Sequence, residues 1–532
     1  MTRMTRRTTP PRSWRSWTTR AGRACVGLLV VCAVASPGAA GPRHRLIEAV
    51  KTGDLGAVRA LIAGSADVNA PDVDGTTALH WAVHTDRLPI AGMLLRAGAD
   101  ASAGDRYGVT PLYLACVNGN ADMIRRLLEA GSDANAVDPA GETALMTAAR
   151  TGVPAALRVL LERGARVDTR EPEFQQTALM IAVRENHAPA VRLLVEHGAA
   201  VDARTRTGPT PAFSPPCKGT GCGSEGVGIN RGGLPDRGRR GEARGGLTPL
   251  LYAARDGRPD AARLLVEAGA DLELADANGI RPLLMAVLNN HLDVARLLIA
   301  RGAEVNADDF WGRTPLWAAV EYRNLDMNNR DQDSPTDNGV DRAPILAFIE
   351  ELIGAGANVN ARTREVPPSR RWLYSLGDVS WVDVTGQTPF LRAALSGDTA
   401  AMRLLLKHGA DPNLATPAGT TPLMAAAGVN WVVAQTYTES PQALIDAVTL
   451  CLELGADVNA TNSMGLTALL GAANRGSNDI IELLVRRGAR LDVKDKEGRS
   501  ALRWAEGVFL AAVGAERKPA TIALLEKLGA TP

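Results

Sequence analysis

The chain has 532 residues, and its 59 basic side chains almost balance its 58 acidic ones, which leaves a formal net charge of +1. A protein that is held on nucleic acid by phosphate contacts needs a strong basic excess, so this charge excludes nucleic acid as an expected partner. With 45% hydrophobic residues, the composition is that of a folded protein and excludes a disordered chain.

The first 40 residues have the three-part pattern of a secretory signal. Residues 1–47 contain nine arginines and no acidic residue. The apolar run within them, Ala24–Ala35, is shorter than the about 20 residues that a membrane-spanning helix needs. We therefore expect residues 1–40 to be a signal peptide that is cleaved near Ala40, and the mature chain to be periplasmic or secreted, with no transmembrane segment. The alternative is a basic tail on a cytoplasmic protein.

The sequence then repeats with a period of 33 residues, most clearly at Gly75, Gly108 and Gly141. Each unit opens with Gly and then Thr-Pro or Thr-Ala, where Thr is a good helix N-cap and Pro is tolerated in the first turn. A second helix carries paired leucines and ends at a Gly, which stops it in a left-handed conformation. Each unit therefore predicts two short helices and a polar hairpin.

These units resemble the ankyrin repeat. The resemblance lies in Thr-Pro-Leu-x-x-Ala-Ala followed by Leu-Leu-x-x-Gly-Ala-Asp-Val-Asn at this spacing. It implies an all-α repeat solenoid of stacked ankyrin helix-turn-helix units with β-hairpin loops. The register gives about twelve units, with about five in residues 41–207 and about seven in residues 246–532. Ankyrin-repeat proteins generally bind other proteins, so the resemblance implies a protein–protein interaction scaffold whose concave groove holds an unidentified partner protein.

Departures from the register mark insertions. Residues 208–245 are rich in Gly, Pro and Arg and poor in large apolar residues, which predicts a loop that is partly disordered. Further insertions lie near residues 324–344, 363–385 and 428–441. The last two are rich in aromatic residues, although only 4% of the whole chain is aromatic.

Aromatic side chains dominate the energetics of interfaces, so their positions predict the contact surface. Three of them stand at hairpin tips where the repeat normally has polar residues, and five lie in the two aromatic-rich insertions. Arg370 and Arg371, which lie beside the aromatic residues of the insertion near 363–385, would give a cationic rim for an acidic partner. The predicted partner-binding residues are Tyr107, Phe310, Trp311, Arg370, Arg371, Trp372, Tyr374, Trp381, Trp431 and Tyr437. The alternative is that the aromatic insertions pack as a small core of their own. We expect the chain to be a monomer.

No residue pattern indicates an enzyme, a cofactor or a metal site. His80 and His84 have a metal-binding spacing, but Trp81 stands where a zinc-protease motif needs Glu. Cys217 and Cys222 favour a local disulfide in an exported protein, with free thiols or a pair of metal ligands as alternatives. We therefore expect no catalytic residues. A second hypothesis is an envelope protein that binds a small ligand or a metal ion through its insertions.

Overall fold

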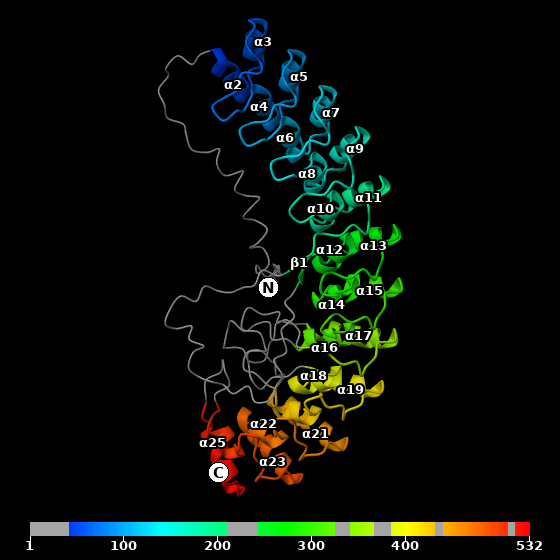
Figure 1. Ribbon diagram of the computed structural model, residues 1–532, viewed down its shortest axis with the longest axis vertical. Coiled ribbons are helices and arrows are strands. Elements are labelled where there is room, and N and C mark those ends of the chain that lie inside the picture. The colour runs from blue at the N-terminus through cyan, green and yellow to red at the C-terminus, as the bar shows by residue number, and fades with distance from the viewer. Residues whose placement is uncertain (1–41, 210–242, 325–340, 366–384, 431–439, 509–515) are drawn as a thin grey trace, which may run out of the picture. The chain divides into compact units, whose positions relative to one another are not determined.

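The computed structural model describes residues 42–209, 243–324, 341–365, 385–430, 440–508 and 516–532 (Figure 1). It divides into two compact units, unit 1 (Met1–Asp100) and unit 2 (Ala101–Pro532), which are taken separately below. The described residues form 24 helices and a single two-stranded sheet. The expected all-α repeat solenoid is confirmed.

Every repeat is a pair of helices. In unit 1 the pairs are α2 (Pro42–Thr52) with α3 (Leu55–Ala63) and α4 (Ala78–His84) with α5 (Leu88–Arg96). The first helices of unit 2 are α6 (Pro111–Asn118), α8 (Ala144–Thr151), α10 (Ala178–Arg184), α12 (Pro249–Asp256), α14 (Pro282–Leu288), α16 (Pro315–Arg323), α18 (Pro389–Ser396), α20 (Pro422–Ala427), α22 (Ala468–Arg475) and α24 (Ala501–Ala505). The second helices are α7 (Ala121–Glu129), α9 (Pro154–Glu162), α11 (Ala188–Glu196), α13 (Pro259–Glu267), α15 (Leu292–Ala300), α17 (Arg342–Gly354), α19 (Thr399–Lys407), α21 (Pro441–Glu453), α23 (Asn478–Arg486) and α25 (Pro519–Lys527).

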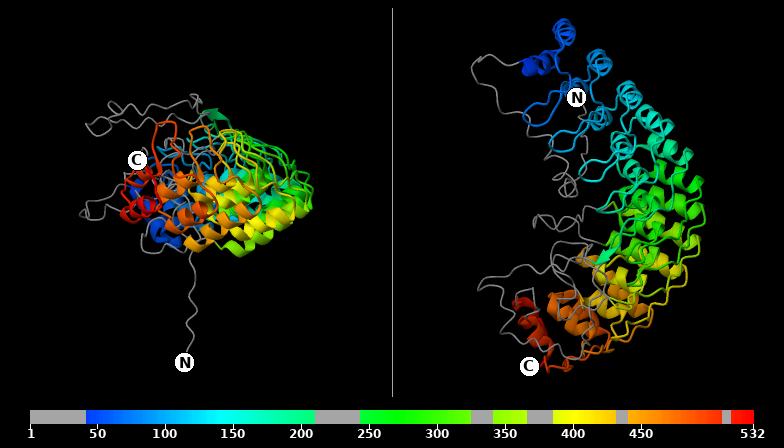
Figure 2. Two further views of the ribbon diagram at one scale, coloured as in Figure 1. Left: turned by 90° about the horizontal axis from the view of Figure 1, so that it is seen from below. Right: turned by 45° about the horizontal axis from the view of Figure 1, so that its top comes forward.

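In unit 2 the helices form two rows (Figures 1 and 2). Each first helix from α6 to α22 contacts the first helix of the next repeat, and each first helix from α6 to α24 packs on its own second helix. Small residues such as Ala148 and Ala149 let the first helices approach closely, and both are fully buried. Leucines of the second helices, such as Leu127 and Leu160, fill the space between the rows. Burying such a leucine stabilises the fold by about 1.5–3 kcal/mol.

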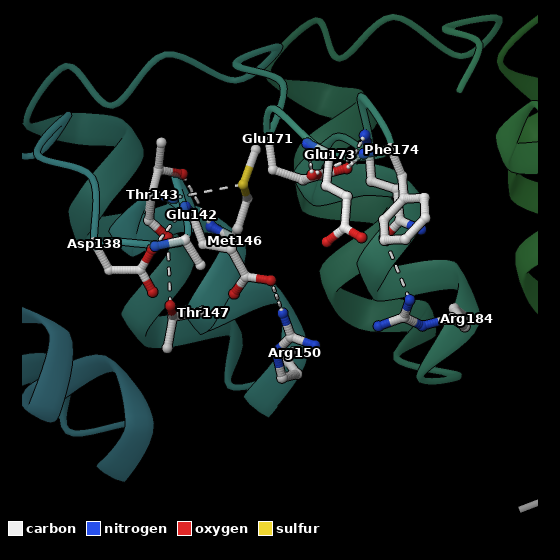
Figure 3. Close-up of polar contacts among 12 residues, drawn as sticks. Asp138, Glu142, Thr143, Met146, Thr147, Arg150, Glu171, Glu173, Phe174 and Arg184 are labelled. Carbon is white, nitrogen blue, oxygen red and sulfur yellow. Dashed lines mark hydrogen bonds and ion pairs between the residues drawn. The ribbon is translucent and has the colours of Figure 1, made fainter. Parts of the chain in front are cut away.

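In most repeats of unit 2 the opening threonine caps the first helix as predicted, whereas α14 follows Arg281 and α24 is capped by Ser500. Thr143 Oγ1 accepts a hydrogen bond from the backbone N–H of Met146 at 3.2 Å, and the Met146 sulfur lies 3.5 Å from the Thr143 backbone nitrogen (Figure 3). Thr110 and Thr314 cap α6 and α16 in the same way. Such a cap contributes about 1 kcal/mol to stability. The threonine that carries the strongest part of the repeat signal therefore also stabilises the first helix.

Most of the described hairpins that join the repeats are tight turns held by an acidic side chain, although Thr416 and Asn462 take this place in two of them. Asp138 Oδ1 accepts hydrogen bonds from the backbone N–H groups of Ala140 (2.9 Å) and Glu142 (2.8 Å), and the Asp138 N–H donates to the Glu142 carbonyl (Figure 3). Asp105 holds its hairpin in the same way. The described strands are limited to β1 (Gly208–Pro209) and β2 (Ala243–Arg244), which pair antiparallel.

One hairpin carries an extra residue, which explains why the unit at Gln175 opens one position late. Glu171 replaces the usual Asp, and its longer side chain accepts from the N–H groups of Glu173 (2.7 Å), Phe174 (2.8 Å) and Gln176 (2.8 Å). Gln175 takes the left-handed conformation that Gly adopts in the other units, with φ at 61°. The additional methylene of Glu171 thus spans the longer turn.

Side chains that follow the second helices link each repeat to the next. Asn135 donates to the Gly164 carbonyl at 3.0 Å and accepts from the Arg166 N–H at 2.8 Å. Asn306, Asn360 and Asn459 make the same two bonds to their next repeats. Asp168 keeps only the accepting bond, from the Ala200 N–H at 2.9 Å, because an ionised carboxylate has no donor.

Replacing Asp168 with asparagine is expected to raise the free energy of unfolding by about 1 kcal/mol. The new amide would donate to the Gly198 carbonyl, which is the counterpart of Gly164, and would keep the bond from Ala200. Urea denaturation of the variant and the parent measures the difference. The reverse change, Asn135→Asp, should lower stability by a similar amount. If Asp168→Asn leaves the free energy of unfolding unchanged or lowers it, these bonds do not couple the repeats.

Candidate functional site

Exposed apolar side chains gather at the hairpins of unit 2. Among the described residues of this unit, six large apolar side chains are exposed, and four of them lie in hairpins. These four are Tyr107 (64% exposed), Val137 (55%), Phe174 (54%) and Phe310 (43%), and we call them the tip residues. Burial of such side chains against a partner is favourable, so they are candidate contact residues.

Two of the predicted contact residues are tip residues. Tyr107 sits in the turn that Asp105 holds, with its backbone N–H 2.8 Å from Asp105 Oδ1. The Phe310 ring lies over the preceding hairpin, where a Cβ added to Gly279 would meet the ring at 2.8 Å. The Phe310 N–H also donates to the Asn278 carbonyl at 3.2 Å. The backbones of both residues are therefore held at fixed places in their hairpins.

Trp311 differs from the expectation, because it is only 3% exposed. The Arg313 guanidinium lies 5.1 Å from the centre of its ring, and Arg313 Nε pairs with the buried Asp309 carboxylate at 2.6 Å. The Trp311 carbonyl also accepts hydrogen bonds from the N–H groups of Arg364 and Glu365. In this structure Trp311 is a packing residue that joins two hairpins.

The other predicted contact residues lie outside the described part of the chain. They are Arg370, Arg371, Trp372, Tyr374, Trp381, Trp431 and Tyr437. Cys217 and Cys222 also lie outside it. Their predicted roles stay predictions.

Sequence reasoning missed Phe174 and Val137. The signal that selected Tyr107 applies equally to Phe174, since this aromatic residue also stands directly before the residue that opens a repeat. Phe174 lies in the hairpin with the extra residue, so it does not align with Tyr107 when the repeats are compared at a period of 33 residues. Val137 is aliphatic, so the signal from aromatic residues at hairpin tips does not apply to it.

Beside the tips, the first helices of unit 2 present paired polar groups. Arg150 forms an ion pair with Glu142, while Arg184 donates to Gln176 at 3.2 Å (Figure 3). Gln176 in turn donates to the Tyr252 hydroxyl of the next repeat at 3.0 Å. Burial raises the pKa of Tyr252 above its usual range, so this phenol stays neutral near neutral pH. These groups satisfy one another, which leaves the tip residues as the main apolar anchors.

Titratable side chains in the described residues have structural roles. His80 is 2% exposed, and its Nδ1 accepts from the Thr77 N–H at 3.1 Å, so it caps α4. Cys116 and Cys451 are buried free thiols, and burial raises the pKa of each to about 12. Within the described ranges, no three His, Cys, Asp or Glu side chains are grouped to hold a metal ion. The helices found there are also too short or too polar to cross a membrane.

Comparison with known proteins identifies the repeat. A family model described as ankyrin repeats (3 copies) matches residues 46–138, 118–205, 234–309, 250–329, 347–435 and 439–508, which is well over half of the chain. The chain belongs to the ankyrin-repeat family. Ankyrin repeats are in general protein–protein interaction modules and typically are not enzymes.

The similar proteins share ankyrin repeats over a limited length. The chain is 34% identical over 121 residues to human ankyrin repeat and KH domain-containing protein 1, which covers 22% of this chain and 4% of that protein. It is 33% identical over 123 residues to the Drosophila melanogaster ankyrin repeat and KH domain-containing protein mask, which covers 23% of this chain and 3% of that protein. The chain thus matches only a small part of these relatives.

Among solved structures, the crystal structure of the human ASB11 ankyrin repeat domain is similar, with a TM-score of 0.37 and 26% sequence identity. This match covers 49% of the present chain and 98% of the human domain.

Proposed function

We propose that this ankyrin-repeat chain is an exported scaffold that binds a partner protein through the tip residues and first helices of unit 2. The observation that carries the proposal is the placement of four exposed apolar side chains in successive or nearby hairpins. Aromatic side chains have few rotatable bonds and lose little conformational entropy when they are buried, so Tyr107, Phe174 and Phe310 suit the role of anchors.

The export part of the proposal is supported by the amino-terminal sequence. Its nine arginines, short apolar run and small residues before Ala40 have the order of a secretory signal. Under this proposal the mature chain is periplasmic or secreted. Mass spectrometry of the protein recovered from its native host should find a mature amino terminus close to Ala40. An intact amino-terminal segment in the cytoplasmic fraction would contradict export.

The aromatic insertions are the proposed source of specificity. Trp372, Trp381 and Trp431 belong to segments that interrupt the repeat register, and the arginines at 370 and 371 add positive charge beside them. Because insertions vary independently of the repeat core, they are suitable places for residues that select one partner.

The experiment is a quantitative pull-down from extracts of the native host with three forms of the full chain. The first is the parent, the second carries Tyr107→Ser, Val137→Ser and Phe174→Ser, and the third carries Leu454→Ser. Leu454 is a matched control, because it is 37% exposed and follows α21 in the row of second helices. We expect a protein that the parent and the control retain and the tip variant loses.

Two results would overturn the proposal. Retention of the same protein by all three forms would place the contact away from the tip residues. Loss of the protein from the Leu454→Ser form as well would show that the capture depends on general surface hydrophobicity. Circular dichroism of all three forms checks that the helices are intact.

A further inference from the structure

A basic depression that is widely open to solvent, called the cavity below, lies beside the hairpin that carries Phe174. Its volume is about 530 Å³, and its lining residues are Arg170, Gln175, Arg204, Thr205, Arg206 and Thr207. Arg170 comes from one hairpin and the other two arginines from the segment that follows the next repeat. The Arg206 backbone N–H donates to the Phe174 carbonyl at 2.8 Å, so the backbone of Phe174 is bonded to a segment that lines the cavity.

Backbone carbonyl groups hold all three guanidinium groups in place. Arg170 donates to the Arg204 carbonyl at 3.0 Å, and Arg206 donates to the Pro172 carbonyl at 2.8 Å. Arg204 donates to the Ala275 carbonyl of the following repeat. Each of these bonds uses one terminal nitrogen of the guanidinium group, so other N–H donors remain for a ligand.

No carboxylate of the described residues forms an ion pair with these three arginines. The nearest buried acid is Glu171, whose two oxygens already accept the N–H groups of its own turn. Glu173 is an exposed acid of the same hairpin, and its side chain is free of ion pairs with the described residues (Figure 3). The cavity therefore carries positive charge that the fold does not use.

We propose that this cavity binds a carboxylate-rich segment of a partner protein, with Phe174 covering an apolar residue beside it. The inference rests on the proposed function and adds the chemistry of the partner. The planar guanidinium group binds a carboxylate through two parallel hydrogen bonds, and three of them around one cavity fit more than one acidic side chain.

The observations favour an acidic peptide over a phosphate ligand. A cavity of about 530 Å³ has the size of a site for several side chains and is larger than one phosphate ion requires. Nucleic acid would need an extended basic surface, whereas the formal charge of the whole chain is only +1. Phe174, an exposed aromatic residue whose backbone is bonded to Arg206, offers an apolar contact for a peptide.

The test begins with selection of peptides from a random-peptide display library on the full chain. We expect the selected peptides to be enriched in Asp and Glu. One selected peptide, labelled with fluorescein, is then titrated by fluorescence anisotropy. Its binding should weaken by about tenfold or more in a form with Arg170→Gln, Arg204→Gln and Arg206→Gln, and Glu173→Gln should strengthen it.

The matched control removes three arginines from the second helices of the same region, as Arg158→Gln, Arg192→Gln and Arg263→Gln. These arginines are also exposed and line a separate surface over α9, α11 and α13. The control has the same net charge as the cavity variant and should bind the peptide like the parent. Arg206→Glu alone provides a second cavity variant that changes a single exposed residue.

Three outcomes of the peptide experiments would overturn the inference, and a fourth comes from the pull-down. One is a selection without acidic enrichment, and another is equal weakening in the cavity and control variants. The third is displacement of the peptide by inorganic phosphate or a single-stranded oligonucleotide at lower concentration than by the unlabelled peptide. If the cavity variant still retains the partner that the tip variant loses, the inference fails and the proposed function stands.

Discussion

Replacing Asp398 with alanine is expected to destabilise the repeats around α16–α19 by about 3–5 kcal/mol. The carboxylate is fully buried and pairs with Arg323 at 2.7 Å and Arg342 at 3.1 Å. It also accepts from Asn324 Nδ2 at 3.1 Å and from the Ala401 N–H at 3.2 Å, which caps α19. Its removal leaves two arginines without their main counter-charge, and a buried charge without its partner is costly.

Hydrogen exchange measured by mass spectrometry resolves this loss along the chain. Amides of α16–α19 should exchange faster in Asp398→Ala, while those of α8–α11 should be unchanged, because repeats contact only their neighbours. Asp492→Ala is the matched control, since its ion pair with Arg490 is exposed. This control should leave exchange unchanged. Equal exchange in the parent and Asp398→Ala would contradict the expectation.

A further variant, Asp398→Asn, gives a pH dependence. Burial alone would raise the pKa of Asp398, but the hydrogen bonds and charge of Arg323, with the charge of Arg342, outweigh it and hold the pKa below its ordinary value. A carboxyl group with a lowered pKa stabilises the fold above about pH 4 and loses this effect as the pH falls through the folded-state pKa. The stability difference between the parent and Asp398→Asn should therefore shrink in acid.

Replacing Phe348 with alanine is expected to cost about 3–5 kcal/mol. This ring is fully buried on α17, and the Arg296 guanidinium of the neighbouring repeat lies 5.7 Å from its centre. The change leaves a cavity between repeats that neighbouring helices can fill only in part. Urea denaturation should show an earlier transition that involves the repeats around α17.

Phe174→Ala is the matched control for this prediction, because it makes the same change at a ring that is 54% exposed. We expect it to leave the urea transition unchanged and to weaken partner binding. Equal destabilisation by the two changes would mean that Phe174 belongs to the core, which would remove it from the proposed contact surface.

The sequence predicts the local features of the fold, because each depends on residues close together in the chain. Thr143 caps its helix through a residue three positions later, and Asp138 holds a turn of five residues. The 33-residue period then places the helix pairs. The spacing of Gln175 shows that a residue is added, but the role of Glu171 in spanning the longer turn needs the structure.

Features that join distant segments could not be predicted. Trp311 stands at a hairpin tip, yet it is buried because Arg364 and Glu365, more than fifty positions later, bond to its carbonyl. Asp398 meets Arg323 across an insertion that interrupts the register. The arginines of the cavity are more accessible to prediction, since Arg170 and Arg204 occupy nearly equivalent places in consecutive repeats. The sequence singles out arginines only beside the aromatic insertions, and no aromatic insertion marks Arg170 or Arg204.

Site-specific photo-crosslinking tests most directly whether the hairpins are the contact surface. A photoreactive phenylalanine analogue is placed at Tyr107, Phe174 or, as the control, Leu454, and the full chain is irradiated in its native host. We expect one shared partner adduct at Tyr107 and Phe174 and none at Leu454. An adduct that forms as readily at Leu454, or irradiation that yields no adduct at either hairpin, would contradict the proposal that the hairpins are the contact surface.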